Sequence, residues 1–334
     1  MSEKFSHLKY YKDKTILITG GFGYIGSSVV SVLNKISCNI IIVTKENRKA
    51  VNFSKGAAQI SVVKADIRKK DIWKNLLSGV DVLFHFAAQT SSSVANDNPS
   101  LDVEVNLLPV VNIIETCIKN DLSPHIIFSG TVTQVGFTSI YPVNESFKDV
   151  PITIYDINKL AAEKYLQFYS NQLGNHAVTL RLSNVYGPGP RSSSADRGIL
   201  NIMIRKALQG EPLTIYGDGN FIRDYIFIDD VAEAFLLAGV KIDALRGNYY
   251  VIGSGIGSTI KDAVNIIKDK VMKKTKRNVE VAFISPPEDI SQIEYRNFVA
   301  DTNRFSSLTG WKAKISLGEG IDRTINYFLK ESKV

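Results

Sequence analysis

Residues 15–26 read TILITGGFGYIG, and this stretch indicates the fold more clearly than any other part of the sequence. TILIT is short, apolar and rich in β-branched residues, which is typical of a buried strand. SSVVSVLNKI, at 27–36, has the spacing of apolar residues that a helix requires. The glycines at positions 20, 23 and 26 therefore lie in a turn between a strand and a helix.

A glycine-rich turn at this junction favours dinucleotide binding. Glycines permit a tight turn and let backbone N–H groups approach a pyrophosphate, while the N-terminus of the helix adds positive potential. The same spacing also occurs in ordinary turns, so the context of strand, turn and helix carries the prediction. The expected cofactor contacts here are Gly20, Phe22, Gly23, Tyr24, Ile25 and Gly26.

The rest of the chain repeats this alternation of strand and helix. Apolar runs are found at 39–44, 60–66, 81–88, 125–130 and 177–183, and helical patterns at 103–119 and 156–173. Continuous apolar strands between helices imply a parallel sheet covered on both faces. The predicted fold is α/β, a Rossmann-type doubly wound parallel sheet with a smaller, interleaved α/β substrate-binding lobe.

The loop GPGPRSSSADRG, at 187–198, is too rich in Pro, Gly and Ser for a core element and indicates a boundary. We expect a dinucleotide-binding domain over 1–183 and a mainly substrate-binding lobe over 184–334. Segments near 223–253 are expected to return to the first domain, because strand-like patterns reappear there.

Composition narrows the class of protein. The chain has 334 residues, is 44% hydrophobic and carries a net charge of +7. Residues 1–14 lack the apolar stretch of a secretory signal, and no run approaches the length of about 18 apolar residues that spans a membrane. We therefore expect a cytoplasmic protein with no membrane partner. Cys38 and Cys117 lie in apolar segments, which argues against disulfides, and no metal site is predicted.

One basic segment, KDKVMKKTKR at 268–277, could suggest nucleic acid by its charge. The alternative is the solvated end of an amphipathic helix. No basic motif interleaved with aromatic residues accompanies it, so no nucleic-acid partner is predicted. Positive charge also suits an enzyme whose cofactor and substrate both carry diphosphates.

The end of the second strand bears on the choice of cofactor. An acidic residue that binds the ribose 2′-hydroxyl is expected there, but the chain has Thr44 and Lys45, with Arg48 close by. These side chains could bind a phosphate, which slightly favours NADP(H) over NAD(H). Alternatively, the cations are solvated and NAD binds through other contacts. Asp66 is a candidate for the adenine edge, or else caps the third strand.

Tyr155 and Lys159 in YDINK project from one face of a predicted helix. A tyrosine with an ordinary pKa of about 10 is a poor base at neutral pH, but a neighbouring ammonium group favours the phenolate. The strand ending in IIFSGT brings Ser129 and Thr131 to the ligand-binding edge of the sheet, and Thr131 is our choice for a hydrogen bond to the reacting oxygen. Alternatively, its hydroxyl only caps the strand.

Together these motifs resemble a known family. The motifs are TGGFGYIG (19–26), ADIR (65–68), HFAAQ (85–89), FSGT (128–131), YDINK (155–159), RLSNVYGPG (181–189), GEPLTIYGDGNFIRDYIFIDDVAEA (210–234) and ADTNR (300–304). Over nearly its whole length the chain is similar to the extended short-chain dehydrogenases that act on sugar nucleotides, such as UDP-galactose 4-epimerase and GDP-4-keto-sugar reductases. The resemblance implies a nucleotide-sugar substrate and a homodimer formed by the helices at 103–119 and 156–173.

The resemblance also assigns roles to individual residues. It makes Thr131, Tyr155 and Lys159 the catalytic group and Asn106 a buried organiser. Further cofactor contacts are implied at Ile67, Ala87, Ala88 and Gln89, and also at Tyr155 and Lys159. Substrate contacts are implied at Thr131, Asn184, Arg191, Arg223 and Arg296.

The residues after Thr131 differ from the pattern of part of this family, which reduces the number of reactions that we expect. The dehydratases carry an Asp-Glu pair after the catalytic Ser or Thr, whereas this chain reads Thr131-Val132-Thr133-Gln134. Water elimination needs a general acid, so a dehydratase is not expected. Our first expectation is keto/alcohol redox at sugar C4 by a reductase or dehydrogenase, which the missing ribose-binding acid favours. The alternatives are a 4-epimerase with retained NAD and, less favoured, a non-catalytic redox sensor.

Overall fold

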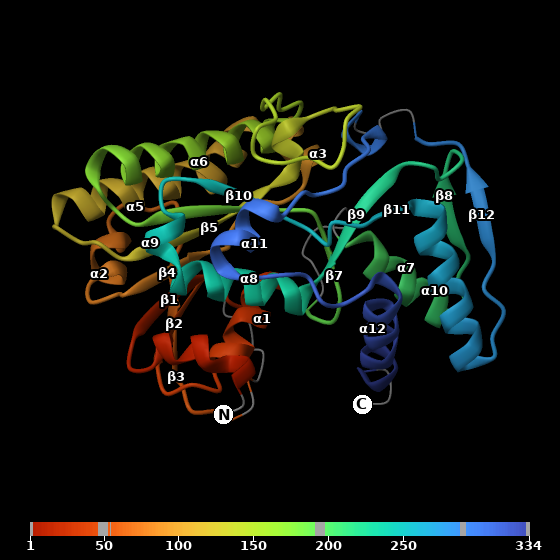
Figure 1. Cartoon of the computed structure of the whole chain (residues 1–334), viewed down its shortest axis with the longest axis horizontal. Helices are drawn as coiled ribbons and strands as arrows, with labels where there is room; N and C mark the ends of the chain where they lie inside the picture. Colours follow the sequence, from red (N-terminus) through yellow and green to blue (C-terminus); the bar gives the residue numbers. More distant parts are fainter. Residues whose placement is uncertain (1–2, 46–52, 54, 191–197, 288–291, 332–334) are drawn as a thin grey trace.

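The structure, a computed structural model, describes residues 3–45, 53, 55–190, 198–287 and 292–331. Figure 1 shows a larger lobe built on one sheet and a smaller lobe in which α7, α10 and α12 pack beside short strands. Among the described helices, none combines the length and the apolar character needed to cross a bilayer.

The larger lobe contains a sheet of seven strands, all paired in parallel, in the order β3-β2-β1-β4-β5-β6-β10. The strands are β1 (Thr15–Thr19), β2 (Asn39–Thr44), β3 (Gln59–Lys64), β4 (Val82–His85), β5 (His125–Thr131), β6 (Ala177–Leu182) and β10 (Tyr249–Ile252). The strand order reverses at β1, and ligands of such sheets bind at the carboxyl ends of the strands beside this reversal. The predicted doubly wound fold is confirmed.

Helices cover both faces of this sheet, because its strands are apolar on both sides. One face packs against α1 (Tyr24–Leu33), α8 (Ile228–Val240), α9 (Ile242–Leu245) and α11 (Asn303–Thr309). The other face packs against α2 (Ile72–Leu77), α5 (Leu108–Lys119) and α6 (Ile154–Leu173). The short helices α3 (Ser92–Asp97) and α4 (Pro99–Asp102) lead into α5.

The expected helix at 103–119 begins differently in the structure. Val103–Leu107 forms a π-helical turn, η2, before α5 continues as a regular helix. Turns of this kind are often found at functional sites. The helix expected at 156 begins at Ile154, because the Thr153 side chain accepts a hydrogen bond from Asp156 N and caps it.

The smaller lobe has two short sheets and three main helices. β7 (Asn184–Tyr186), β9 (Ile222–Phe227) and β11 (Gly257–Thr259) form one sheet, and β8 (Leu213–Tyr216) pairs with β12 (Val281–Ile284). Their apolar faces pack against α7 (Ile199–Gln209), α10 (Ile260–Thr275) and α12 (Leu317–Glu331). Single turns of 3₁₀ helix are η3 (Val132–Val135) and η4 (Gln292–Tyr295), and η1 (Glu3–Tyr11) precedes β1.

The two lobes are interleaved along the chain. β10 returns to the large sheet beside β6, whereas β9 joins the small sheet; Ile226 of β9 and the helix after it, α8, pack in the core of the large sheet. The segment 225–235 is therefore shared by both lobes. The functional division at residue 183 stays a prediction, and in the structure that position separates β6 from β7.

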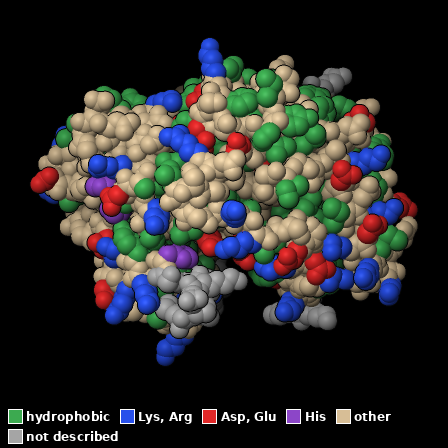
Figure 2. All heavy atoms as spheres, in the orientation of Figure 1, with side chains coloured by type: hydrophobic (Ala, Val, Ile, Leu, Met, Phe, Trp, Pro, Cys, Tyr) green, Lys and Arg blue, Asp and Glu red, His purple; other side chains and the backbone are tan. Residues whose placement is uncertain are grey.

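The basic segment of the sequence lies at the end of α10. Lys270 and Lys274 form ion pairs with Asp322 of α12, which partly neutralises this helix end. On the face shown in Figure 2, Lys and Arg side chains lie among Asp and Glu side chains over the smaller lobe. The charge pattern of this face is that of a solvated protein surface.

Candidate active site

The glycine turn leaves no room for side chains at positions 20 and 26. Gly20 has φ +70°, and a Cβ there would lie 2.9 Å from Ala87 N. A Cβ on Gly26 would lie 2.2 Å from Gly20 O. Gly23 caps α1 without any side-chain hydrogen bond, so the N–H groups of the first turn face no competing side-chain acceptor from the cap. This cradle fits the pyrophosphate of a dinucleotide.

The first residue of α1 connects the turn to the smaller lobe. Tyr24 donates its hydroxyl proton to Gly187 O at 2.8 Å, and Asn201 Nδ2 donates to the Tyr24 hydroxyl at 3.2 Å. A Cβ on Gly189 would lie 2.8 Å from the Tyr24 ring. Ile25, the next residue, packs against the cores of both lobes. The helix that would bind the cofactor is thereby fixed against the smaller lobe.

The residues predicted to select the cofactor lie at the ends of β2 and β3. Thr44 is half-buried, and Lys45 is exposed. Arg68 binds both carboxylate oxygens of Asp66, with 2.6 Å between its Nη2 and Oδ2. Hydrogen bonds from Arg68 lower the pKa of Asp66 to about 2. Ile67 packs beside this pair in the core, and Arg48 lies outside the described residues.

Beyond β4, the predicted cofactor residues meet a buried polar cluster. Ala87 N donates to Thr19 Oγ1 at 3.2 Å, and Ala88 follows it in the same half-buried segment. Gln89 Nε2 donates to Asp102 Oδ1 at 2.9 Å. Asp102, which is fully buried, also accepts from Asn106 Nδ2 and Asn158 Nδ2. The carboxylate thus ties α4, η2 and α6 together beside the cofactor edge.

Asn106 lies in the π-helical turn and is buried, as the family resemblance implies. Its side-chain N–H group donates to both Asp102 and Gln89 O. Its oxygen, Oδ1, is buried and accepts no hydrogen bond within the described residues. A buried acceptor of this kind requires a donor from a water or a ligand.

Thr131, Tyr155 and Lys159 lie in the interior, 6%, 5% and 3% exposed. Thr131 ends β5, and Tyr155 and Lys159 occupy the first two turns of α6, which packs on β5. Lys159 Nζ lies 4.0 Å above the ring centroid of Phe128 in β5, within the range of a cation–π contact. The structure therefore gathers the three residues at the carboxyl end of β5.

A buried histidine also packs against Phe128. The His85 ring stacks on Phe128 at 5.9 Å, and its Nδ1 shares a hydrogen bond with Thr19 Oγ1. Burial, with a smaller contribution from the Lys159 charge, lowers the pKa of His85 to about 3. The imidazole is therefore neutral at physiological pH and leaves Lys159 as the cation of this part of the site.

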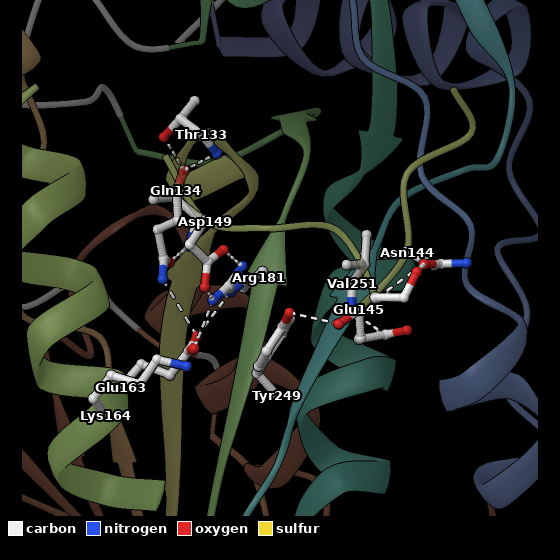
Figure 3. Close-up of polar contacts among 12 residues, drawn as sticks. Thr133, Gln134, Asn144, Glu145, Asp149, Glu163, Lys164, Arg181, Tyr249 and Val251 are labelled. Carbon is white, nitrogen blue, oxygen red and sulfur yellow. Dashed lines mark hydrogen bonds and ion pairs between the residues drawn. The ribbon is translucent and has the colours of Figure 1, made fainter. Parts of the chain in front are cut away.

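Gln134 connects the backbone of Thr131 to an ion network formed by Glu163, Arg181 and Asp149; Figure 3 shows Gln134 and this network. Thr131 N donates to Gln134 Oε1 at 3.0 Å, and Gln134 Nε2 donates to Glu163 at 3.4 Å. Arg181, fully buried, pairs with both Glu163 and Asp149. Burial alone would lower the pKa of Arg181, but these two carboxylates outweigh it and raise the pKa. The guanidinium also lies 3.6 Å from the centroid of the Tyr249 ring.

The two arginines expected at the substrate diphosphate lie in the smaller lobe. Arg223 in β9 is 3% exposed and donates to Arg296 O and, at 2.6 Å, to Glu294 O. Arg296 donates to Ile293 O at 2.8 Å. Burial lowers the pKa of Arg223, and the charge of Glu294 opposes this. The structure brings the two arginines together through backbone carbonyls.

The other two predicted substrate contacts are Asn184 and Arg191, and the structure describes the first of them. Asn184 begins β7 and its Oδ1 is buried, with no hydrogen-bond partner among the described residues. Arg191 lies outside the described residues.

Several residues of the site were not predicted from the sequence. They are Asp102 and Asn158 beside Gln89, Arg181 with its two carboxylates, and Thr133 with Asp156 beside Thr131. Asp156 directly follows Tyr155 in YDINK, and this adjacency was the available signal. Its partner Thr133 comes from another element, which only the folded chain reveals.

Comparisons with known proteins agree with this geometry. The sequence profile of the NAD dependent epimerase/dehydratase family matches residues 16–253. The UDP-glucose 4-epimerase of Mycolicibacterium smegmatis is 28% identical over 322 residues, covering 95% of this chain and 99% of that protein.

Two solved structures extend the likeness to the whole fold. The UDP-glucose 4-epimerase of Thermotoga maritima, solved with UDP-glucose, has a TM-score of 0.84 and 30% identity, covering 95% of this chain and 99% of that one. The UDP-glucose 4-epimerase of Thermus thermophilus, solved with NAD, has a TM-score of 0.78 and 28% identity, covering 94% and 99%.

Proposed function

The chain belongs to the NAD-dependent epimerase/dehydratase family, and on that premise we propose that it is a UDP-sugar 4-epimerase with retained NAD. The observation that carries the proposal is the group Thr131, Tyr155 and Lys159, buried at the carboxyl end of β5 near the glycine turn. The similar proteins described above are 4-epimerases, which favours this reaction over the 4-keto reductase that we expected first.

In the proposed reaction, the glycine turn at Gly20, Gly23 and Gly26 would hold a dinucleotide, which would supply a reversible hydride acceptor for sugar C4. Tyr155 exchanges the proton of the C4 hydroxyl, and Lys159 stabilises the phenolate by its charge. The Phe128 ring holds the Lys159 ammonium group in place through a cation–π contact, with 4.0 Å between Nζ and the ring centroid. Thr131 orients the reacting oxygen. Because no net oxidation results, the enzyme needs no second redox substrate.

The smaller lobe would hold the rest of the substrate. We assign Arg223 and Arg296 to the diphosphate, since guanidinium groups bind phosphate oxygens in a fixed fork geometry. Asn184, with its unused buried oxygen, is assigned to a sugar hydroxyl. To bind the diphosphate, Arg223 would either donate to phosphate oxygens in addition to its present carbonyl partners or give up those carbonyls in favour of phosphate.

Retained NAD is testable directly. The purified protein is denatured, the released nucleotide is identified by mass spectrometry, and the native protein is then incubated with UDP-glucose or UDP-galactose. We expect NAD and interconversion of the two sugars without added cofactor. Release of NADP, or turnover that requires added NADPH, would instead support the reductase and the predicted role of Lys45.

A homodimer is part of the proposal. The outer sides of α5 and α6, which lie together on one face of the sheet (Figure 1), expose large apolar side chains. These are Leu108, Ile118, Ile157, Tyr165, Phe168 and Leu173. Apolar patches of this kind often mark subunit interfaces. Light scattering should give twice the chain mass for the native protein and the single chain mass for Phe168→Glu.

A further inference from the structure

The hydroxyl of Thr131 is the first member of a hydrogen-bonded chain that ends on a buried carboxylate. Thr131 Oγ1 lies 2.7 Å from Thr133 Oγ1, and the Thr133 hydroxyl donates to Asp156 Oδ1. Thr153 Oγ1 donates to the other oxygen, Oδ2, at 2.6 Å. Asp156 is fully buried. Thr133 thus connects this carboxylate to the hydroxyl oxygen of Thr131, which is expected to lie beside the sugar.

Counting protons fixes the direction of this chain. An ionised carboxylate only accepts hydrogen bonds, so the single hydroxyl proton of Thr133 points to Asp156. The contact between Thr131 and Thr133 must then use the proton of Thr131. Thr133 N also donates to Thr131 Oγ1, at 3.3 Å. Thr131 therefore has one lone pair left, which is available to accept a hydrogen bond from a sugar hydroxyl.

We propose that Thr131, Thr133 and Asp156 form a proton relay that operates alongside Tyr155; this rests on the proposed function. When the hydride leaves sugar C4, the C4 hydroxyl proton moves to Thr131 Oγ1. The proton of Thr131 moves to Thr133, and that of Thr133 moves to Asp156, which becomes a neutral carboxylic acid. The C4–H electron pair leaves with the hydride, and the C4=O bond forms, so charges and atoms balance.

The relay also accounts for the return step. Once Asp156 holds the proton, it donates to Thr133, and Thr133 donates to Thr131. Thr131 then donates to the ketone oxygen instead of accepting from a hydroxyl. Each transfer therefore leaves the hydrogen bonds in the direction that the next transfer requires, and hydride return draws the proton back along the same path.

Asp156 has a structural role that must be separated from this one. It is the third residue of α6, and its N–H group and Oδ2 both bond to the Thr153 hydroxyl that caps the helix. The relay uses the other oxygen, Oδ1. Thr153→Ala removes the helix cap and the hydrogen bond to Oδ2 but leaves the bond from Thr133 to Oδ1. Thr133→Val removes the bond to Oδ1 with little change in side-chain volume.

The test measures reduction of bound NAD by UDP-glucose in Thr133→Val, Thr133→Ser and Thr153→Ala, each combined with Tyr155→Phe. In this background we expect Thr133→Val to lower the rate about a hundredfold with KM unchanged, because the relay then carries the proton transfer that remains. Thr133→Ser should restore the rate and its slowing in D₂O. Thr153→Ala should lower thermal stability and reduce the rate far less than Thr133→Val does, because Thr133 still donates to Asp156 Oδ1. Equal rates in Thr133→Val and Thr133→Ser would overturn the relay.

The same substitution with Tyr155 intact shows whether the two proton routes are parallel. There we expect Thr133→Val to change the rate by less than about twofold, because Tyr155 carries nearly all of the proton transfer. The same factor in both backgrounds would mean a purely structural role. Asp156→Asn, which keeps an acceptor oxygen for the helix cap, replaces Thr133→Val if the latter does not fold.

A measurement without substrate separates this proposal from the proposed function. The infrared difference between the wild type and Asp156→Asn at neutral pH should show a carboxylate band. A band of a protonated carboxyl group would overturn the relay whichever sugar the enzyme uses. A carboxylate band together with no reaction of bound NAD with UDP-glucose or UDP-galactose would instead contradict the proposed function.

Discussion

Two regions of the proposed site are built in different ways: Thr131, Tyr155 and Lys159, here named the catalytic edge, and Arg223 with Arg296, here named the arginine corner. Thr131 and Tyr155 lie on β5 and α6, whose positions are set by main-chain hydrogen bonds and by the Arg181 ion network. The Arg223 and Arg296 side chains instead donate mainly to backbone carbonyls of the segment 293–296 around η4, and Arg223 also pairs with Glu294. The first region is held by regular elements and a buried ion network, whereas the second is held by contacts that, on the proposed function, a diphosphate would replace.

This difference matches the demands of the two tasks. Proton and hydride transfer need reacting atoms within a narrow range of positions, which rigid elements provide. Diphosphate binding needs charge and donors, and these tolerate small displacements. Substitutions in the two regions should therefore have different signatures, one in the rate of the chemical step and the other in affinity.

The largest effect is expected from Tyr155→Phe. Removing the phenol oxygen should slow reduction of bound NAD by UDP-glucose about 10³-fold, which is the mid-range for a general acid–base group. The measurement is the absorbance of reduced nicotinamide in single-turnover mixing. Retained nucleotide content serves as the control, and a variant that lost affinity for the sugar with a normal rate would place Tyr155 in the binding region instead.

Arg181→Met tests what fixes the catalytic edge. It leaves Glu163 and Asp149 buried without their cation, so the free energy of unfolding should fall by about 3 kcal/mol. Urea unfolding measures this. The matched control is the triple variant Arg181→Met, Glu163→Gln and Asp149→Asn, which removes the uncompensated charges and should recover most of the loss. An unchanged midpoint in the single variant contradicts the rigid description of this edge.

Arg223→Met tests the arginine corner. The loss of a charged donor to phosphate should cost about 2 kcal/mol, or about thirtyfold in KM for the UDP-sugar, with kcat nearly unchanged. Arg223→Lys keeps the positive charge but loses the fork of N–H donors, so its KM should lie between those of the wild type and Arg223→Met. Steady-state kinetics decides, and a fall in kcat at constant KM would show that this corner belongs with the catalytic edge.

The smallest expected effect is a pH dependence from His85. Its pKa of about 3 in the folded chain is below the ordinary value of 6.5, so the unfolded chain binds an additional proton between these values. Stability should therefore fall as the pH drops below 6.5, by about 1 kcal/mol at pH 5.5 from this group. Urea midpoints at pH 7 and 5.5 measure it. His85→Gln should show a smaller difference, and an equal difference would assign the effect to other groups.

Much of the catalytic edge could be predicted from the sequence because its signals are local. The glycine turn, the apolar strands and the pair Tyr155 and Lys159 each depend on residues within one or two turns of the chain. The parallel arrangement of strands in the large sheet follows from the same alternation, whereas their order was read from the structure. The preference for NADP, drawn from Lys45 and Arg48, has no such support, and identification of the bound nucleotide has to decide it.

The remaining parts of the site depend on residues far apart in the sequence. Asp156 was recognisable only as the neighbour of Tyr155, because its partner Thr133 lies in η3, the 3₁₀ turn that follows β5. Arg181 meets Asp149 and Glu163 from three separate segments. Polar residues buried in this way give no periodic pattern, since each is satisfied by a particular partner and not by a face of its own element.

The sequence by itself determined the doubly wound sheet, the cofactor turn and the positions of Thr131, Tyr155 and Lys159, because hydrophobic periodicity and backbone requirements act over short stretches. The tertiary structure alone decided that β9 joins the small sheet, that Arg223 binds the carbonyls of 294 and 296, and that Thr131 leads to a carboxylate. The physical reason is that hydrogen-bond partners in the interior are chosen by packing between elements.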